Sequence, residues 1–204
     1  MGAALGVIGV LISGRGSNLQ AIIDAIESGR LRARIGVVIS NRADAAGLER
    51  AARAGIETAI VPHKAHPDRE SYDRALVELL KAHGVDLVCL AGFMRMLGPH
   101  FVQAFPNAVL NVHPSLLPAF PGLDAQRQAL EHGVRVSGAT VHFVTPALDA
   151  GPIICQACVP VEDDDTVETL SARILEQEHR LYPEAIARVL AGRWQLQGRR
   201  VVSG

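Results

Sequence analysis

The chain begins with a continuous apolar run, Leu5 to Ile12, that strongly limits the folds open to it. A run that does not alternate with polar residues is typical of a strand buried on both faces, as in parallel sheets covered by helices. A glycine-rich segment, Ser13 to Asn18, interrupts the run, and residues 19–26 then show helical spacing. This start predicts a strand, a tight loop and a helix.

The same alternation of strand and helix continues to residue 111. We expect strands at 33–40, 58–61, 85–91 and 108–111, and helices at 44–54, 69–83 and 99–105. Strands that alternate with helices predict right-handed β–α–β units and a mostly parallel sheet.

The rest of the chain has a different pattern. Two strand-like segments, 136–144 and 152–159, follow each other without a helix between them, which predicts an antiparallel pair. Helical patterns cover 123–132 and 166–190, and we expect Pro183 to break or kink the second.

The predicted fold class is therefore α/β: a Rossmann-like, mostly parallel twisted sheet flanked by helices, with antiparallel strands added in the C-terminal part. We expect one domain over residues 1–204, made of a phosphate-binding half at 1–110 and a catalytic half at 111–204.

Composition excludes several classes of protein. The chain has 20 Lys and Arg residues against 21 Asp and Glu, so its net charge is -1. A broad nucleic-acid surface or a polybasic membrane anchor would need a basic excess. The start has no basic segment, and Leu5–Ile12 is too short to span a bilayer. We expect a soluble, cytoplasmic protein with no nucleic-acid or membrane partner.

The cysteines and histidines do not form a metal-binding pattern. Cys155 and Cys158 match C-x-x-C, but on the predicted strand they point to opposite faces, and no second pair is present. We expect ordinary packed cysteines. The eight histidines are scattered, so we expect no metal.

The loop after the first strand suits an anion. Gly14 and Gly16 let the backbone approach a ligand, and the start of the following helix favours negative charge. Arg15 and the hydroxyls of Ser13 and Ser17 can add hydrogen bonds.

A dinucleotide fingerprint would need a third glycine, where Leu19 stands, and a Walker loop would need Gly-Lys-Ser/Thr. A single phosphate therefore fits better. The alternative is a plain tight turn in which Ser17 caps the helix.

A second polar group follows the strand at 108–111. Asn111 and His113 are two residues apart, so an extended backbone directs them to the same side. With Asp149 they could form one site: an amide for an oxyanion, an imidazole for a proton, and a carboxylate to orient the ring. Each could also be structural, and the spacing does not show that Asp149 reaches His113.

Four segments carry a resemblance to a known family. They are Ser13–Gln20, Ala91–Leu97, Asn111–Pro118 with its His-Pro-Ser-Leu-Leu-Pro motif, and Leu148–Pro152. In this order they resemble the phosphoribosylglycinamide formyltransferase family, the folate-dependent transformylases of purine synthesis, over nearly the whole chain.

The resemblance implies transfer of a formyl group from 10-formyltetrahydrofolate to the amine of glycinamide ribonucleotide. It implies Asn111, His113 and Asp149 as catalytic residues. The implied ribonucleotide contacts are Gly14, Arg15, Gly16, Ser17, Asn18 and Glu178. The implied folate contacts are Arg69, Met94, Arg95, Met96, Leu97, Asn111, Thr145, Pro146, Ala147, Leu148 and Asp149. Phe93, Met94, Met96 and Leu97 would form an apolar wall for a flat pterin.

The chain departs from the family pattern at a few positions. Ala119 stands where many relatives carry Lys or Arg, and Asp124 and Gln126 stand where relatives often place histidines. These changes concern the loop after Pro118 rather than the catalytic residues. Arg15 stands where many relatives have Asn, and it adds positive charge beside the expected phosphate.

Other readings remain open. A formyltetrahydrofolate deformylase would hydrolyse the same donor, but it usually has an extra amino-terminal regulatory domain. A methionyl-tRNA formyltransferase would add a carboxyl-terminal RNA-binding domain. A non-catalytic nucleotide-sugar binding module would bind ligand without turning over folate. We expect small-molecule partners and a monomer or homodimer.

Overall fold

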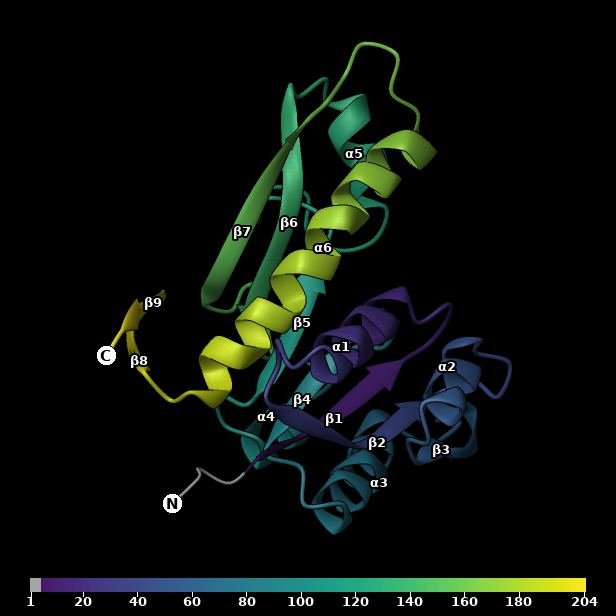
Figure 1. Ribbon diagram of the computed structural model, residues 1–204. Helices are drawn as coiled ribbons and strands as arrows, with labels where there is room; N and C mark the ends of the chain where they lie inside the picture. The colour runs from purple at the N-terminus through teal and green to yellow at the C-terminus, as the bar shows by residue number, and fades with distance from the viewer. Residues whose placement is uncertain (1–4) are drawn as a thin grey trace. The chain divides into compact units, whose positions relative to one another are not determined.

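Figure 1 shows the computed structural model of the protein, which describes residues 5–204. The chain divides into two compact units, the first ending at Leu110 and the second beginning at Asn111. The boundary falls within strand β5 (Val109–His113).

The first unit contains a parallel sheet. Its strands are β1 (Gly6–Ile12), β2 (Ala33–Ser40), β3 (Thr58–Ile60) and β4 (Leu87–Leu90), in the order β3-β2-β1-β4. Its helices are α1 (Ser17–Glu27), α2 (Gly47–Arg53), α3 (Arg69–Ala82) and α4 (Pro99–Ala104), with a 3-10 turn η1 (His63–Ala65). Every residue of β1 after Gly6 is buried, as the apolar run predicts.

Helix α3 packs closely against β1. A Cβ on Gly9 would lie 2.4 Å from Leu80 Cδ2, so glycine leaves the space that this leucine fills. Helix α1 buries Leu19, Ile22 and Ile23 along one side. The helices thus cover the apolar strands of this unit.

The second unit is built around an antiparallel pair, β6 (Val136–Phe143) and β7 (Ile153–Pro160). The strand order here is β5-β6-β7-β9-β8, where β9 (Arg200–Ser203) is parallel to β7 and β8 (Trp194–Gln197) is antiparallel to β9. Helix α5 (Ala125–Glu131) precedes β6, and the long helix α6 (Val167–Leu190) runs along β6 and β7 (Figure 1). The predicted α/β class is confirmed.

Three details differ from the sequence predictions. Helix α6 continues through Pro183 to Leu190, so the expected break does not occur. The hairpin β8–β9 was not predicted. Cys155 and Cys158 both lie on β7, but Cys158 is exposed rather than packed, and Cys89 alone of the three is buried.

Burial raises the pKa of Cys155 to about 11, so its thiol stays protonated at neutral pH. Among residues 5–204, no helix has the length and apolar character needed to cross a membrane.

Candidate active site

Strand β5 places two polar side chains on one face. Val109 and Leu110 are buried, and Val112 turns away from the side that carries Asn111 and His113. Asn111 is half-buried and His113 is buried. The end of β5 therefore presents an amide and an imidazole on the same side.

Asp149 approaches His113 from the loop between β6 and β7. Its φ of 46° is in the left-handed region, and its side chain is 10% exposed. One carboxylate oxygen, Oδ2, lies 3.5 Å from His113 Nδ1 and accepts a hydrogen bond from the Gly122 N–H at 2.8 Å. The structure thus provides the contact that residue spacing left open.

Both ring nitrogens of His113 face acceptor oxygens. Nε2 lies 2.9 Å from the Phe120 carbonyl oxygen, and Nδ1 faces Asp149. A carbonyl and a carboxylate can only accept hydrogen bonds, so each ring nitrogen faces a group to which it can donate. The Ser115 hydroxyl donates to the Ala119 carbonyl at 2.5 Å and holds the turn that supplies Phe120.

His142 is a further member of this group that the sequence predictions missed. It lies on β6, is 2% exposed, and places Nε2 3.7 Å from Asp149 Oδ1 and 3.3 Å from Asn111 Nδ2. Its signal in the sequence is a histidine within an apolar strand, Val141-His142-Phe143. That pattern cannot show which strand lies beside it.

The surroundings of His142 define its tautomer. Nδ1 lies 2.9 Å from the Phe143 carbonyl oxygen, which can only accept, so Nδ1 carries a proton. Burial lowers the pKa of His142, with the nearby His113 adding to the effect, although the Phe143 carbonyl and Asp149 oppose it. In the neutral ring Nε2 is an acceptor, and the Asn111 amide donates to it.

This group can carry out proton and oxyanion chemistry. The amide nitrogen of Asn111 has a second N–H, and the His113 ring lies beside the Asp149 carboxylate. Both can donate hydrogen bonds to a developing negative charge. Asp149 places a carboxylate beside the ring, where it can orient the imidazole.

The predicted anion loop lies in the first unit. Gly16 has a φ of 70° and is the N-cap of α1, and the first turn contains neither a side-chain cap nor an acidic residue. Ser17 is the first helical residue, so the alternative in which Ser17 caps the helix is wrong. The backbone dipole at this helix start remains available to an anion.

Gly14 and Gly16 of the loop differ in their surroundings. A Cβ on Gly16 would lie 2.6 Å from Gly47 Cα, so packing excludes a side chain there. A Cβ on Gly14 would meet nothing within 4 Å, and both Gly14 and Arg15 are exposed. Open space above an exposed glycine is what a ligand needs to approach the backbone. Ser17 is half-buried and Asn18 is buried.

Ser13 differs from the sequence prediction. Its hydroxyl donates to Asn41 Oδ1 at 2.7 Å and accepts from the Met94 N–H at 2.8 Å. The hydroxyl hydrogen is already used inside the protein, and the side chain is buried. Ser13 therefore does not offer its hydroxyl hydrogen to a phosphate.

The predicted folate wall is smaller than expected. Met94 and Met96 are 64% and 48% exposed, whereas Phe93 and Leu97 are buried in the core of the first unit. The two methionines alone present an apolar surface, and Arg95 beside them is exposed.

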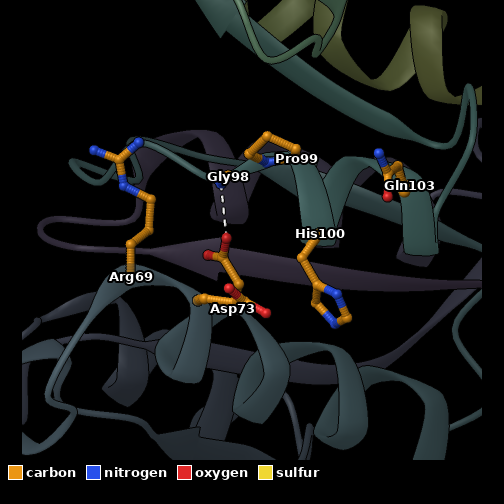
Figure 2. Close-up of a pocket in the computed structure, with 7 residues that line it drawn as sticks. Arg69, Asp73, Gly98, Pro99, His100 and Gln103 are labelled. Carbon is orange, nitrogen blue, oxygen red and sulfur yellow. Dashed lines mark hydrogen bonds between the residues drawn. The ribbon is translucent and has the colours of Figure 1, made fainter.

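Arg69 lines a pocket at the start of α3. The pocket has a volume of about 370 Å³ and is lined by Arg69, Glu70, Asp73, Gly98, Pro99, His100 and Gln103. Figure 2 shows the Asp73 carboxylate reaching toward Gly98. An exposed guanidinium at the mouth of such a pocket can bind a carboxylate.

The remaining predicted residues lie in the second unit. Thr145 is half-buried, while Pro146, Ala147 and Leu148 are exposed beside Asp149. Glu178 is buried on α6.

The positions that depart from the family pattern lie around the start of α5. Asp124 is its N-cap, Gln126 is within its first turn, and Ala119 is exposed before it. Among residues 5–204, no group of three His, Cys, Asp or Glu side chains could hold a metal ion.

Comparison with known proteins identifies the family. A family model described as formyl transferase matches residues 7–186. The chain is 50% identical over 187 residues to the phosphoribosylglycinamide formyltransferase of Escherichia coli K12, covering 92% of this chain and 88% of that protein. It is 51% identical over 189 residues to the trifunctional purine biosynthetic protein adenosine-3 of Homo sapiens, covering 93% of this chain but only 19% of that protein.

Solved structures agree with this. Glycinamide ribonucleotide transformylase 1 from Symbiobacterium toebii has a TM-score of 0.96 and 60% identity, covering 98% of this chain and 94% of that chain. A formyltetrahydrofolate deformylase from Pseudomonas syringae has a TM-score of 0.92 but 29% identity, and the match covers 98% of this chain and 66% of that chain. The transformylase is therefore the more similar of the two.

Proposed function

The chain belongs to the formyl transferase family, and from that premise we propose that it transfers the formyl group of 10-formyltetrahydrofolate to the amine of glycinamide ribonucleotide in purine biosynthesis. The observation that carries the proposal is the approach of Asp149 to within 3.5 Å of His113, next to Asn111 at the end of β5. The high identity to phosphoribosylglycinamide formyltransferases supports this substrate pair over others.

The proposed reaction is a direct transfer without a covalent enzyme intermediate. The neutral amine of the ribonucleotide attacks the formyl carbon and forms a tetrahedral intermediate with a negatively charged oxygen. The bond from that carbon to N10 of the folate then breaks. One proton leaves the attacking amine, and one proton reaches N10, with water as the carrier.

The proposed roles follow from the local geometry. Asn111, oriented by His142, donates an N–H to the oxyanion, and the His113 imidazolium donates a second hydrogen bond. Because Nε2 of His113 contacts the Phe120 carbonyl, its donation to substrate requires exchange of that partner. Asp149 keeps the ring charged and oriented. Each oxyanion donor of this kind is typically worth about 10²–10³ in rate.

The proposed binding residues are those that the family resemblance implies. The loop Gly14–Asn18 binds the ribonucleotide phosphate, and Glu178 binds another part of the same substrate. The proposed folate contacts are Arg69, the segment Met94–Leu97 and the loop Thr145–Asp149. No metal takes part in the proposed reaction.

The test is a spectroscopic assay for the deformylated folate, run with and without glycinamide ribonucleotide. Turnover only in the presence of the ribonucleotide is the expected result. Turnover without it would identify a deformylase, the alternative that the Pseudomonas syringae structure keeps relevant. Ligand binding without turnover would identify a binding module.

A further inference from the structure

The segment Met94–Gly98 is held at both ends by buried side chains from elsewhere in the first unit. At one end, the Met94 N–H donates to Ser13 Oγ at 2.8 Å. At the other end, the Gly98 N–H donates to Asp73 Oδ2 at 2.7 Å. Between these anchors stand the two exposed methionines, Met94 and Met96. The shape of this apolar surface therefore depends on two side chains outside it.

Ser13 is an unusual anchor because it directly precedes the anion loop. Its hydroxyl has one hydrogen, which goes to Asn41 Oδ1 at 2.7 Å, so the oxygen is free to accept from the Met94 N–H. The other end of the Asn41 amide lies 3.3 Å from His63 Nδ1. Ser13 and Asn41 are both buried, so these bonds are shielded from competing water.

Backbone contacts restrain the loop Gly14–Asn18, so we expect it to move together with Ser13 rather than independently of it. The Gly14 carbonyl accepts from the Gly47 N–H at 3.0 Å, and Gly16 packs against the Gly47 backbone. The backbone of Arg15 is also held by helix α2, because its carbonyl accepts a hydrogen bond from Arg50 Nε at 2.9 Å. A ligand that orders the backbone of this loop also orders the residue that holds Met94.

We propose that Ser13 is a positioning residue that couples the two substrate sites, so that an anion bound at Gly14–Asn18 stabilises the folate-binding form of Met94–Leu97. The inference rests on the proposed function for the identity of the two ligands. Coupling of this kind is reciprocal: each ligand strengthens the binding of the other by the same factor.

Asp73 provides the comparison. Its carboxylate is 1% exposed, and Oδ1 has no hydrogen-bond partner among residues 5–204. Burial raises the pKa of Asp73, although the Gly98 N–H and the nearby Arg69 and His100 oppose this. Arg69 and His100 line the same pocket (Figure 2). Asp73 anchors the segment from α3 rather than from the anion loop, so it should affect folate binding without affecting the coupling.

The experiment measures the Kd of tetrahydrofolate under anaerobic conditions, with and without saturating glycinamide ribonucleotide. Tetrahydrofolate carries no formyl group, so no transfer reaction follows its binding. In the wild type we expect the ribonucleotide to lower the Kd about fivefold or more. In Ser13→Ala this ratio should fall to within about twofold of one, since a lost hydrogen bond is typically worth about a fivefold change.

Two further variants separate coupling from general damage. Asp73→Ala should raise the Kd of tetrahydrofolate about fivefold. The factor should be the same with and without ribonucleotide, so the ratio of the two Kd values should stay as in the wild type. Ser28→Ala should change nothing, because among residues 5–204 the Ser28 hydroxyl bonds to carbonyls of helix α1 and to Arg30 alone. A wild-type ratio of one, or a wild-type ratio retained in Ser13→Ala, would overturn the inference.

A measurement on the wild type alone covers the case in which Ser13→Ala does not fold. Hydrogen exchange of the Met94 amide should slow at least about threefold when glycinamide ribonucleotide is added alone. An unchanged exchange rate at saturation would also overturn the inference. In both experiments turnover of the wild type is recorded first, so failure of the coupling is distinguishable from failure of the proposed function.

Discussion

At the scale of single residues, His113 is the side chain with which the proposed chemistry can be tested most simply. It is buried between the Asp149 carboxylate and the Phe120 carbonyl, and both oxygens can accept a hydrogen bond from the ring. We predict that His113→Ala lowers kcat about 10²–10³-fold, because it removes an oxyanion donor. Steady-state kinetics on the folded variant test this. Turnover within a few-fold of the wild type would show that His113 is not catalytic.

His142 determines which way the Asn111 amide points. We predict that His142→Asn lowers kcat about tenfold with a smaller change in KM, because it keeps a group near Nδ1 but removes the acceptor at Nε2. His142→Gln places an oxygen near Nε2 and should restore part of the loss. Equal kcat values in the two variants would contradict the orienting role.

His142 also predicts a dependence of stability on pH. Burial lowers its pKa, whereas in the unfolded chain the ring titrates near its usual value of about 6.5. The unfolded state therefore binds more protons below that pH, and stability falls as the pH drops from about 7 toward 5. Denaturant unfolding across this range should show a smaller fall in His142→Gln than in the wild type. Parallel curves for the two proteins would contradict the buried, neutral ring.

At the scale of elements, the turn between β6 and β7 contacts the backbone that holds His142. A Cβ on Gly151 would lie 1.7 Å from the Phe143 carbonyl oxygen, the same atom that fixes the His142 tautomer. We predict that Gly151→Ala displaces this carbonyl and lowers kcat more than about tenfold. Kinetics and circular dichroism together test this. A folded variant with normal kcat would show that the site does not depend on this contact.

The start of α6 is stabilised by a capping box. The Thr166 hydroxyl accepts from the Thr169 N–H, and the Thr169 hydroxyl accepts from the Thr166 N–H. We predict that Thr166→Ala costs about 1 kcal/mol of unfolding free energy. Ser171→Ala, further along the helix, serves as the control and should stay within about 0.5 kcal/mol of the wild type. Chemical denaturation measures both, and equal stabilities for the two variants would contradict the cap.

At the scale of the whole molecule, the order of the strands and longer helices of residues 5–190 could be predicted from periodicity and turn residues, although the 3-10 turn η1 was not predicted. The hairpin β8–β9 could not, because Trp194–Gln197 becomes a strand only through its partner β9, which in turn pairs with β7. The extent of α6 was predicted, but the break expected at Pro183 does not occur, and Leu181, Tyr182 and Ala185 around it are buried.

The candidate site was predictable only in part, for the same reason. Asn111 and His113 are neighbours in sequence, so their shared face follows from the strand period. Asp149 and His142 reach them through strand pairing and a loop with a left-handed residue, which no local pattern encodes. Ser13 was misassigned because its buried partners, Asn41 and Met94, are distant in sequence.

In the proposed reaction the formyl group passes directly to the ribonucleotide amine. The most direct measurement follows the carbon itself, using 10-formyltetrahydrofolate labelled with ¹³C in the formyl group together with glycinamide ribonucleotide. We predict that the label appears in the formylated ribonucleotide in a one-to-one ratio with the folate released, with no labelled formate. Labelled formate in place of the formylated ribonucleotide would contradict direct transfer.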